Sequence, residues 1–312
     1  MRDWVRGRVE TIYERHLRRS IDSCPDHVAI IQDGNRRYAR NRGVDPSAGH
    51  RRGAQTTEDV LEWCEELGVR ELTVYAFSTE NFERPRGERE SLFDLIETKL
   101  REFADTSEVH ERRVRIRAIG DVDKLPPRVR DAARYAENRT RGYGQFTLNI
   151  ALAYGGRNQL LEAARTTACD VERGSLEPDD IDVDVIEARL YERPIRDVDL
   201  IIRTGGDERT SNFLPWHANG NEAAVFFCTP YWPEFRKIDF LRGVRTYERR
   251  EKSWRRTRVE RARTLCRTIS GPELPDAHSI IDRFQDPLAE PDRTDRTEPR
   301  ERAPEERPAN AD

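Results

Sequence analysis

Apolar positions follow two alternating patterns through the middle of the chain. Short runs rich in β-branched residues have the length and composition of buried strands. These runs cover residues 27–32, 71–77, 114–119, 146–151, 199–202 and 223–227. Apolar residues at helical spacing separate most of them, within residues 60–67, 92–103, 127–140 and 158–169. The alternation predicts an α/β fold, a single domain with a central, mostly parallel six-stranded sheet flanked by helices.

The two ends of the chain differ from this middle part. Trp4, Val9, Ile12 and Leu17 recur at helical spacing, so residues 3–19 are predicted to form an amphipathic helix within an N-terminal segment, 1–22. This helix either packs on the domain, predicted at 23–270, or contacts a membrane surface. Residues 246–265 read as a long charged helix with a solvated face. The charged, Pro-rich tail, 271–312, has too few apolar residues to offset the entropy of ordering and is predicted to be mostly disordered.

Composition and charge narrow the class of protein. The 312 residues are 36% hydrophobic and 37% charged, and no apolar run approaches the roughly 18 residues of a membrane span. No apolar stretch follows a basic start, so no secretory signal is expected. The 55 basic and 59 acidic residues leave no positive surplus for nucleic acid. Five scattered cysteines without metal-ligand spacing suit reduced thiols, so we expect a cytoplasmic protein with no nucleic-acid partner.

Polar loops follow four of the predicted strands, at the edge where parallel sheets bind ligands. They cover residues 33–38, 78–85, 154–158 and 203–212. Their glycines let a backbone approach a ligand, and their arginines suit phosphate oxygens. The phosphate-binding candidates are Arg37, Arg84, Arg203 and Arg209, with the hydroxyl donors Ser78 and Ser211. The set is sufficient for two diphosphate groups.

Two carboxylates accompany these arginines. A carboxylate among phosphates is repulsive unless a cation bridges them, and Mg²⁺ usually binds one or two carboxylates together with substrate phosphates. Asp33 and Glu222 are therefore candidate magnesium ligands, although a surface salt bridge is an equal interpretation of Glu222. Of the histidines, His27 opens a strand and is predicted to be structural, and His217 has no assigned role.

Familiar phosphate-binding signatures are missing. The sequence has no G-x-x-x-x-G-K-[ST] loop and no Gly-x-Gly-x-x-Gly dinucleotide fingerprint after a strand. It also lacks the aspartate-rich D-D-x-x-D pair, which disfavours the all-helical trans-type prenyl synthases.

Five motifs in register resemble those of the cis-prenyltransferases, the undecaprenyl and dehydrodolichyl diphosphate synthases. The motifs are HVAIIQDGN at 27–35, FSTEN at 77–81, LNIA with YGGR at 148–157, DLIIRTGG at 199–206, and SNFL at 211–214 followed by Trp216, Glu222 and Trp232-Pro233. The resemblance covers roughly residues 26–250. It implies an α/β homodimer with an apolar tunnel and a reaction that condenses isopentenyl diphosphate with an allylic diphosphate, setting each new double bond cis.

The resemblance also implies roles for individual residues. Asp33 corresponds to the essential aspartate that holds Mg²⁺ on the allylic diphosphate, and Glu222 to a second metal ligand. Asn81 corresponds to the asparagine assigned to proton removal, with positioning or relay as the interpretation that suits a weakly basic amide. The implied substrate-binding residues are Gly34, Asn35, Arg36, Arg37, Tyr38, His50, Ser78, Thr79, Glu80, Phe82, Arg84, Arg203, Arg209, Thr210 and Ser211.

Several positions depart from the family pattern. Arg36 stands where the family usually has glycine, Tyr38 and Phe82 where tryptophan is common, and Asp207 where glutamate is usual. Pro46 occupies the place of a diphosphate-binding arginine, so that contact is lost or supplied by Arg42, Arg51 or Arg36. Residues 249–254 lack the Arg-x-Gly ending that many members bring to the partner's site.

The high arginine content and charged tail look most like archaeal members, which extend geranylgeranyl diphosphate to polyprenol carriers for glycans. We therefore expect a Mg²⁺-dependent synthase that adds isopentenyl diphosphate to geranylgeranyl or farnesyl diphosphate, with peripheral membrane contact for product release left open. A non-catalytic diphosphate-binding partner subunit is the alternative, and it would be expected to lack Asp33. An unrelated diphosphate- or RNA-binding protein is disfavoured by the neutral charge balance.

Overall fold

The computed structural model describes residues 2–191, 195–218 and 223–268; the side chains of residues 2–9, 11 and 258–268 lie outside this description. The chain divides into two units, Met1–Arg250 and Glu251–Asp312. The first contains the whole sheet. Of the second, the structure describes only the end of a helix, and the tail predicted at 271–312 lies outside the described residues.

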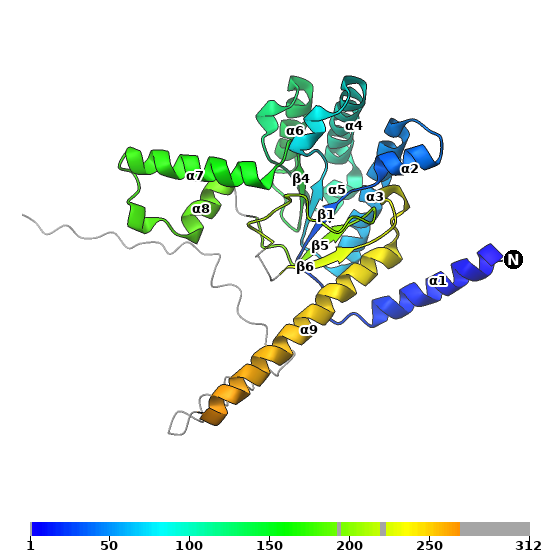
Figure 1. Cartoon of the computed structure of the whole chain (residues 1–312). Coiled ribbons are helices and arrows are strands. Elements are labelled where there is room, and N and C mark those ends of the chain that lie inside the picture. The colour runs from blue at the N-terminus through cyan, green and yellow to red at the C-terminus, as the bar shows by residue number, and fades with distance from the viewer. Residues whose placement is uncertain (1, 192–194, 219–222, 269–312) are drawn as a thin grey trace, which may run out of the picture. The chain divides into compact units, whose positions relative to one another are not determined.

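A six-stranded parallel sheet forms the centre of the first unit (Figure 1). Its order is β3-β4-β2-β1-β5-β6. The strands are β1 (His27–Ile31), β2 (Glu71–Tyr75), β3 (Val114–Ile119), β4 (Phe146–Ala151), β5 (Leu200–Arg203) and β6 (Ala224–Phe227). Every pair is parallel, so the prediction of a mostly parallel α/β sheet is confirmed.

Nine helices are described along the chain, with four short 3₁₀ turns between them. The helices are α1 (Arg2–Arg19), α2 (Asn35–Asn41), α3 (Pro46–Leu67), α4 (Arg86–Asp105), α5 (Ser107–Glu111), α6 (Pro127–Thr140), α7 (Gly156–Glu172), α8 (Val183–Leu190) and α9 (Lys237–Thr268). The 3₁₀ turns are η1 (Thr79–Glu83), η2 (Val122–Lys124), η3 (Pro178–Asp180) and η4 (Trp232–Glu234). Helices α2, α5 and α8 were not predicted, and α3 begins earlier than its apolar pattern. Asp45 caps α3 by accepting a hydrogen bond from the Ser47 amide, and Pro46 occupies its first turn.

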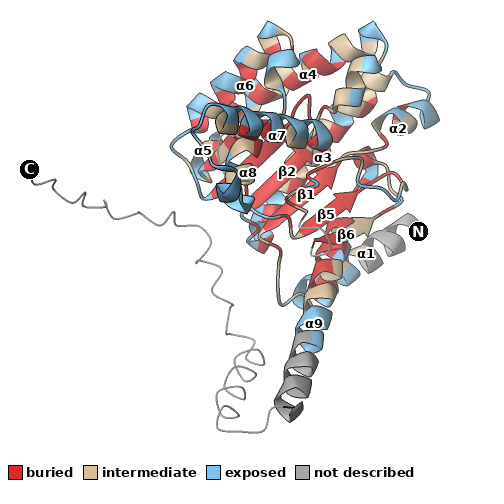
Figure 2. Cartoon of the chain, turned by 60° about the vertical axis from the view of Figure 1, so that its left-hand side comes forward, coloured by how far each residue is buried: buried red, intermediate tan, exposed pale blue. Residues whose placement is uncertain are grey.

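Helices cover both faces of the sheet (Figure 2). Alternate residues of β1 enter different apolar clusters, since side chains of a strand point to opposite faces. Val28 and Ile30 pack with residues of α3, α4, α6 and the first turns of α9. Ala29 and Ile31 pack with residues of α7 and α8. Burial on both faces explains why β1 is apolar at nearly every position.

The N-terminal helix buries only part of its predicted apolar face. Leu17 is buried, whereas Ile12 and Tyr13 are exposed. Among the described residues, no helix is long and apolar enough to cross a bilayer.

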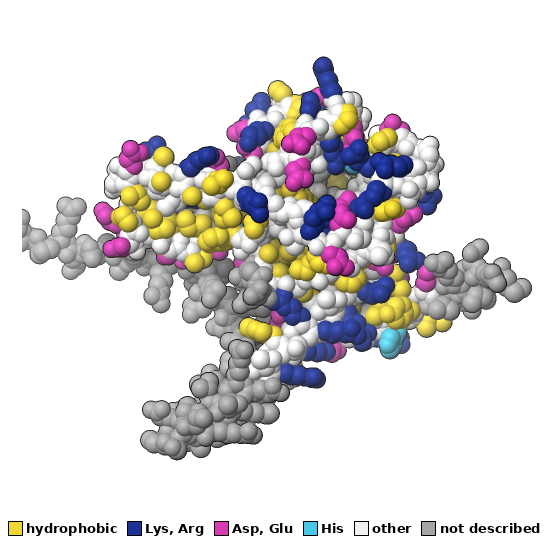
Figure 3. Space-filling view, in the orientation of Figure 1, with side chains coloured by type: hydrophobic (Ala, Val, Ile, Leu, Met, Phe, Trp, Pro, Cys, Tyr) yellow, Lys and Arg dark blue, Asp and Glu magenta, His cyan; other side chains and the backbone are white. Residues whose placement is uncertain are grey.

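A second exposed apolar area lies over α7 and α8, where Figure 3 shows hydrophobic side chains gathered on one face. Leu161 of α7 and Val183 of α8 are more than half exposed, and Ile181, just before α8, is exposed as well. Large apolar side chains grouped in this way are typical of a contact surface.

Candidate active site

Asp33 and Arg203 meet at the carboxyl end of the sheet. Ile31, the last residue of β1, is in register with Arg203, the last residue of β5. Nη2 of Arg203 lies 2.7 Å from Oδ2 of Asp33, and Nη2 of Arg37 lies 3.0 Å from Oδ1. One carboxylate is therefore held between two guanidinium groups that come from different strand ends.

Backbone contacts fix the position of Asp33. Its amide donates to Oγ1 of Thr204, and that hydroxyl donates to the Asp33 carbonyl. The amide of Trp232 donates to the same carbonyl at 2.9 Å. Gly34 follows with a φ of +102°, and a Cβ there would lie 2.6 Å from Cδ1 of Tyr231. Only glycine fits this turn, which aims the start of α2 at the site.

Arg203 joins Asp33 to the loop that follows β5. Its side chain is 3% exposed and donates to the Arg209 carbonyl, to Oδ2 of Asp207 and to Oγ of Ser211. Arg209 pairs with Asp207 at 3.2 Å and leaves two thirds of its own side chain exposed. A buried arginine thus organises the loop, while Arg209 stays accessible to an anion.

The carboxyl of Asp33 remains ionised at neutral pH. Burial alone would raise its pKa, but the hydrogen bond from Arg203 and the charges of Arg37 and Arg203 outweigh burial, so the pKa is lowered. The side chain is 31% exposed. An ionised, accessible carboxylate can contribute an oxygen to a hard cation.

A second carboxylate, Glu88 in the first turns of α4, holds the other arginines of the site. Its Oε1 lies 2.7 Å from Nη1 of Arg84 and 3.3 Å from Nε of Arg36. Nε2 of His50 lies 3.9 Å from the same oxygen. Glu88 is only 11% exposed. Its carboxylate therefore stands where an anionic ligand would meet these two guanidinium groups.

His50 is neutral at physiological pH. Burial lowers its pKa to about 4, the charges of Arg84 and Arg36 contribute, and Glu88 opposes them. Its Nε2 is buried without a hydrogen-bond partner. The ring can therefore offer one nitrogen to a ligand in the pocket.

The amide of Asn81 is oriented by η1. Its Oδ1 accepts from the backbone amide of Ser78 at 3.1 Å, as part of a capping box. Because the oxygen is engaged, the Nδ2 donor is the group that Asn81 can offer to a ligand. A hydrogen-bond donor suits positioning of an anion better than removal of a proton.

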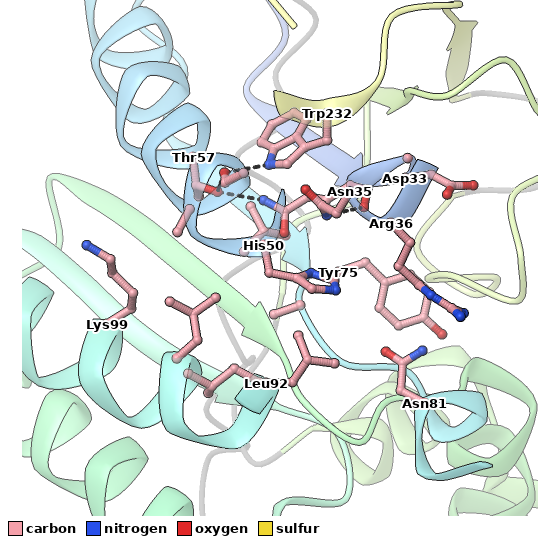
Figure 4. Close-up of a pocket in the computed structure, with 18 of the residues that line it drawn as sticks. Asp33, Asn35, Arg36, His50, Thr57, Tyr75, Asn81, Leu92, Lys99 and Trp232 are labelled. Atoms are coloured by element: carbon pink, nitrogen blue, oxygen red, sulfur yellow. Dashed lines mark hydrogen bonds between the residues drawn. The ribbon is translucent and has the colours of Figure 1, made fainter. Parts of the chain in front are cut away.

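One pocket of about 460 Å³ brings several of these groups together (Figure 4), and its lining includes Asp33, Arg36, His50, Asn81 and Arg84. Asp33, Arg36 and Asn81 lie at one side of the view, and Lys99 of α4 lies at the other, beyond Leu92. Lys99 pairs with Glu58 and Glu102. The pocket lining also includes eight apolar residues, Val74, Leu92, Leu95, Ile96, Leu100, Phe103, Leu148 and Ile150. A charged mouth thus leads into an apolar cavity between the sheet, α3 and α4.

Most of the predicted site residues meet here. The pocket lining includes Asp33, Gly34, Asn35, Arg36, Arg37, His50, Asn81, Arg84 and Arg209. Arg203 and Ser211 stand directly behind Asp33.

The other predicted site residues lie beside the pocket rather than on its wall. Phe82 packs against Phe77, the Tyr38 ring stacks under Arg42, and Glu80 is exposed. Ser78, Thr79 and Thr210 make backbone contacts that shape their loops. Glu222 lies outside the described residues. Roles for these residues stay predictions.

Two pocket residues, Arg40 and Asp207, were missed from the sequence, as was Glu88, which pairs with the pocket residues Arg84 and Arg36. Arg40 lies one turn beyond Arg36 and Arg37 on α2, and that spacing was the available signal. Glu88 follows Arg84 by four residues and had the same signal. Asp207 was noted only as a departure from a motif. Of the three arginines considered as replacements for the one absent at Pro46, only Arg36 lines the pocket. Arg42 donates to Glu234 and Arg51 donates to Ser47, and a compensating role for any of them stays a prediction.

The donor set fits a bound Mg²⁺. Asp33 supplies an ionised carboxylate at the mouth, and the neighbouring arginines attract the phosphate oxygens that complete a magnesium coordination shell.

With this geometry established, similarity to known proteins defines the class. Residues 31–255 match the prenyltransferase family described as putative undecaprenyl diphosphate synthase. The chain belongs to this family, and it is a prenyltransferase.

Close relatives and solved structures agree. The chain is 64% identical over 93% of its length to a tritrans,polycis-undecaprenyl-diphosphate synthase (geranylgeranyl-diphosphate specific) from Halobacterium salinarum, of which 96% is covered. It is 62% identical over 90% of its length to the Haloarcula marismortui protein of the same name, 92% covered. Lavandulyl diphosphate synthase from Lavandula x intermedia, solved with dimethylallyl diphosphate, has a TM-score of 0.66 at 34% identity, covering 72% of this chain and 95% of that one.

Proposed function

We propose that this protein adds isopentenyl diphosphate units in cis to geranylgeranyl diphosphate, and that the long-chain polyprenyl diphosphate is the precursor of a glycosyl carrier lipid. The primer is inferred from the relatives, which are named geranylgeranyl-diphosphate specific. The observation that carries the reaction type is the ionised Asp33, held by Arg37 and Arg203 at the mouth of an apolar pocket.

In the proposed reaction, the allylic C1–oxygen bond breaks and diphosphate leaves. A C–C bond forms between that C1 and C4 of isopentenyl diphosphate, and C2 of the latter loses a proton. Mg²⁺ held by Asp33, with Glu222 as the proposed second ligand, would offset the charge of the leaving group. Arg37 and the residues of the first loop hold the allylic diphosphate.

The second substrate, isopentenyl diphosphate, binds at the loop that follows β5. Arg203, Arg209 and Ser211 hold the diphosphate of isopentenyl diphosphate, with Arg203 linking the two binding sites through Asp33. Asn81 donates from Nδ2 to a diphosphate oxygen, and that oxygen accepts the proton. The growing chain extends along the apolar wall between α4 and the sheet. This wall excludes water from the allylic carbocation left when diphosphate departs.

We propose that two copies associate through the apolar face of α7 and α8, where Leu161, Ile181 and Val183 are exposed. Burying such side chains between two copies removes them from water.

The decisive experiment incubates purified protein with labelled isopentenyl diphosphate and, separately, dimethylallyl, geranyl, farnesyl or geranylgeranyl diphosphate, with Mg²⁺ or with EDTA. Sizing of the lipid products is expected to give long chains, fastest from geranylgeranyl diphosphate and none with EDTA. Faster elongation of farnesyl diphosphate would correct the primer. No incorporation with any primer would favour the non-catalytic partner subunit instead.

A further inference from the structure

A cluster of metal-ligating side chains lies away from the active-site pocket. Glu187 of α8, Asp197 before β5 and His217 after it bring ligand atoms within 4.8 Å of one another. Asp197 precedes the first residue of β5, whereas Arg203 is its last. The cluster is therefore associated with the amino end of this strand, and Asp33 and the pocket with its carboxyl end.

His217 is buried with unused hydrogen-bonding capacity. The residue is 2% exposed, and neither Nδ1 nor Nε2 has a hydrogen-bond partner. The nearest carboxylate oxygen, Oδ1 of Asp197, is 3.8 Å from Nδ1, which is too far for a hydrogen bond. A buried polar group without a hydrogen-bond partner destabilises the fold, so an imidazole in this state requires an explanation. A cation bound between the ring and the carboxylates would supply one.

Contacts around the cluster already hold its three segments together. The amide of Val198 donates to the His217 carbonyl at 2.7 Å. Nε1 of Trp216 donates to Oε1 of Glu187 at 3.1 Å, and the ring of Tyr191 lies 5.0 Å from that of His217. An outer hydrogen bond of the kind made by Trp216 is what orients a ligating carboxylate in metal sites.

The donor set indicates the class of ion. One imidazole nitrogen and two carboxylate oxygens suit a transition-metal ion such as Zn²⁺, whereas Mg²⁺ prefers oxygen ligands alone. Two carboxylates also balance a divalent charge. Three protein ligands leave a position for water.

We propose that Glu187, Asp197 and His217 bind a divalent transition-metal ion, represented by Zn²⁺. The ion joins α8 and the segment before β5 to the loop that carries both His217 and Ser211. Its role is to stabilise the fold on this side of the sheet, independently of the magnesium chemistry at Asp33.

The test uses the full chain without a histidine tag, stripped of metal and kept in excess Mg²⁺ so that oxygen-only sites are filled. Calorimetric titration with ZnCl₂ is expected to give one site per chain, and Zn²⁺ is expected to raise the melting temperature. Asp197→Asn and Glu187→Gln should each weaken Zn²⁺ binding about tenfold or more. Asp197 is half exposed, so its variant keeps the fold.

The control is Asp184→Asn, which removes an exposed carboxylate from the same helix, α8, and should bind Zn²⁺ like the wild type. Absence of a Mg²⁺-insensitive Zn²⁺ site in the wild type would overturn the proposal. Unchanged Zn²⁺ affinity in both test variants would also overturn it, because the ion would then bind elsewhere. So would an equal loss of affinity in Asp184→Asn, because removing any negative charge from this region would then have the same effect.

Discussion

Asp33 and Arg203 form an ion pair across neighbouring strands, with Oδ2 and Nη2 2.7 Å apart. Arg203 is almost completely buried, and its guanidinium also donates to Asp207 and to Ser211. The carboxylate proposed to bind the metal and the loop proposed to bind the second diphosphate therefore share one rigid arginine. A shift of either group is transmitted to the other, since a buried guanidinium has little freedom to rearrange.

Replacing Asp33 with asparagine is expected to lower kcat by about a thousandfold or more. The change removes the negative charge that is proposed to hold Mg²⁺ on the allylic diphosphate. The side-chain volume is retained, so far-UV circular dichroism should stay near the wild-type spectrum, and inorganic pyrophosphate binding should not be lost. Asp131→Asn, at an exposed position of α6, is the control and should leave turnover unchanged. Turnover of Asp33→Asn near the wild-type rate with Mg²⁺ present would refute the metal assignment.

The sequence made Asp33 and Arg203 predictable for a physical reason. Both follow buried strands whose apolar runs are unmistakable, and parallel strands deliver their carboxyl ends to one edge. The sheet and most of the phosphate-binding loops could be placed in the same way. The side-chain partners could not, because the pairing of Glu88 with Arg36 depends on how α4 docks beside α2. The burial of His217 could not be predicted either, because it lies in a loop, where no periodic pattern of apolar residues indicates which side chains are buried.

Glu88 is expected to compete with diphosphate for the guanidinium groups of Arg84 and Arg36. Glu88→Gln removes the charge with little change of shape, so inorganic pyrophosphate should bind about fivefold tighter, equivalent to about 1 kcal/mol. Isothermal titration calorimetry measures this directly. Glu90→Gln, on the same helix but paired with Arg128, should bind like the wild type. Unchanged or weaker binding by Glu88→Gln would show that Glu88 does not occupy the anion position.

The turn after β1 requires glycine at position 34 for two reasons, the positive φ of the backbone and the close approach of Tyr231. Gly34 and Gly43 both have positive φ, but a Cβ on Gly34 would lie within 3.0 Å of Tyr231 atoms, whereas a Cβ on Gly43 meets nothing within 4 Å. Gly43→Ala should therefore cost about 1 kcal/mol of unfolding free energy from backbone strain alone. Gly34→Ala should cost about 2–4 kcal/mol and displace the site as well.

Urea unfolding and steady-state rates measure the two variants. Equal costs for Gly34→Ala and Gly43→Ala would show that the contact with Tyr231 is readily relieved.

The apolar face of α7 and α8 gives a prediction about association. Leu161→Glu combined with Val183→Glu places two charges on the proposed contact surface and should convert a dimer into monomers at micromolar concentration, because burying unpaired charges is costly. Sedimentation equilibrium distinguishes the two states. Val44→Glu, at an exposed apolar position between α2 and α3, is the control and should remain dimeric. A double variant that still sediments as the wild type would place the dimer contact elsewhere.

The neutral His50 makes stability depend on pH. Its folded pKa of about 4 lies below the ordinary value of 6.5, chiefly through burial and then through the charge of Arg84. Between these two values the unfolded chain binds a proton that the folded chain does not, so His50 contributes stability above pH 6.5 that is lost as the pH falls towards 4. The loss from this one group amounts to about 3 kcal/mol at most. Urea unfolding at pH 7 and pH 4.5 should therefore show a smaller drop for His50→Gln than for the wild type, while His16→Gln, at an exposed position of α1, should match the wild type. An equal drop in all three proteins would mean that His50 takes up its proton in the folded state as readily as in the unfolded chain.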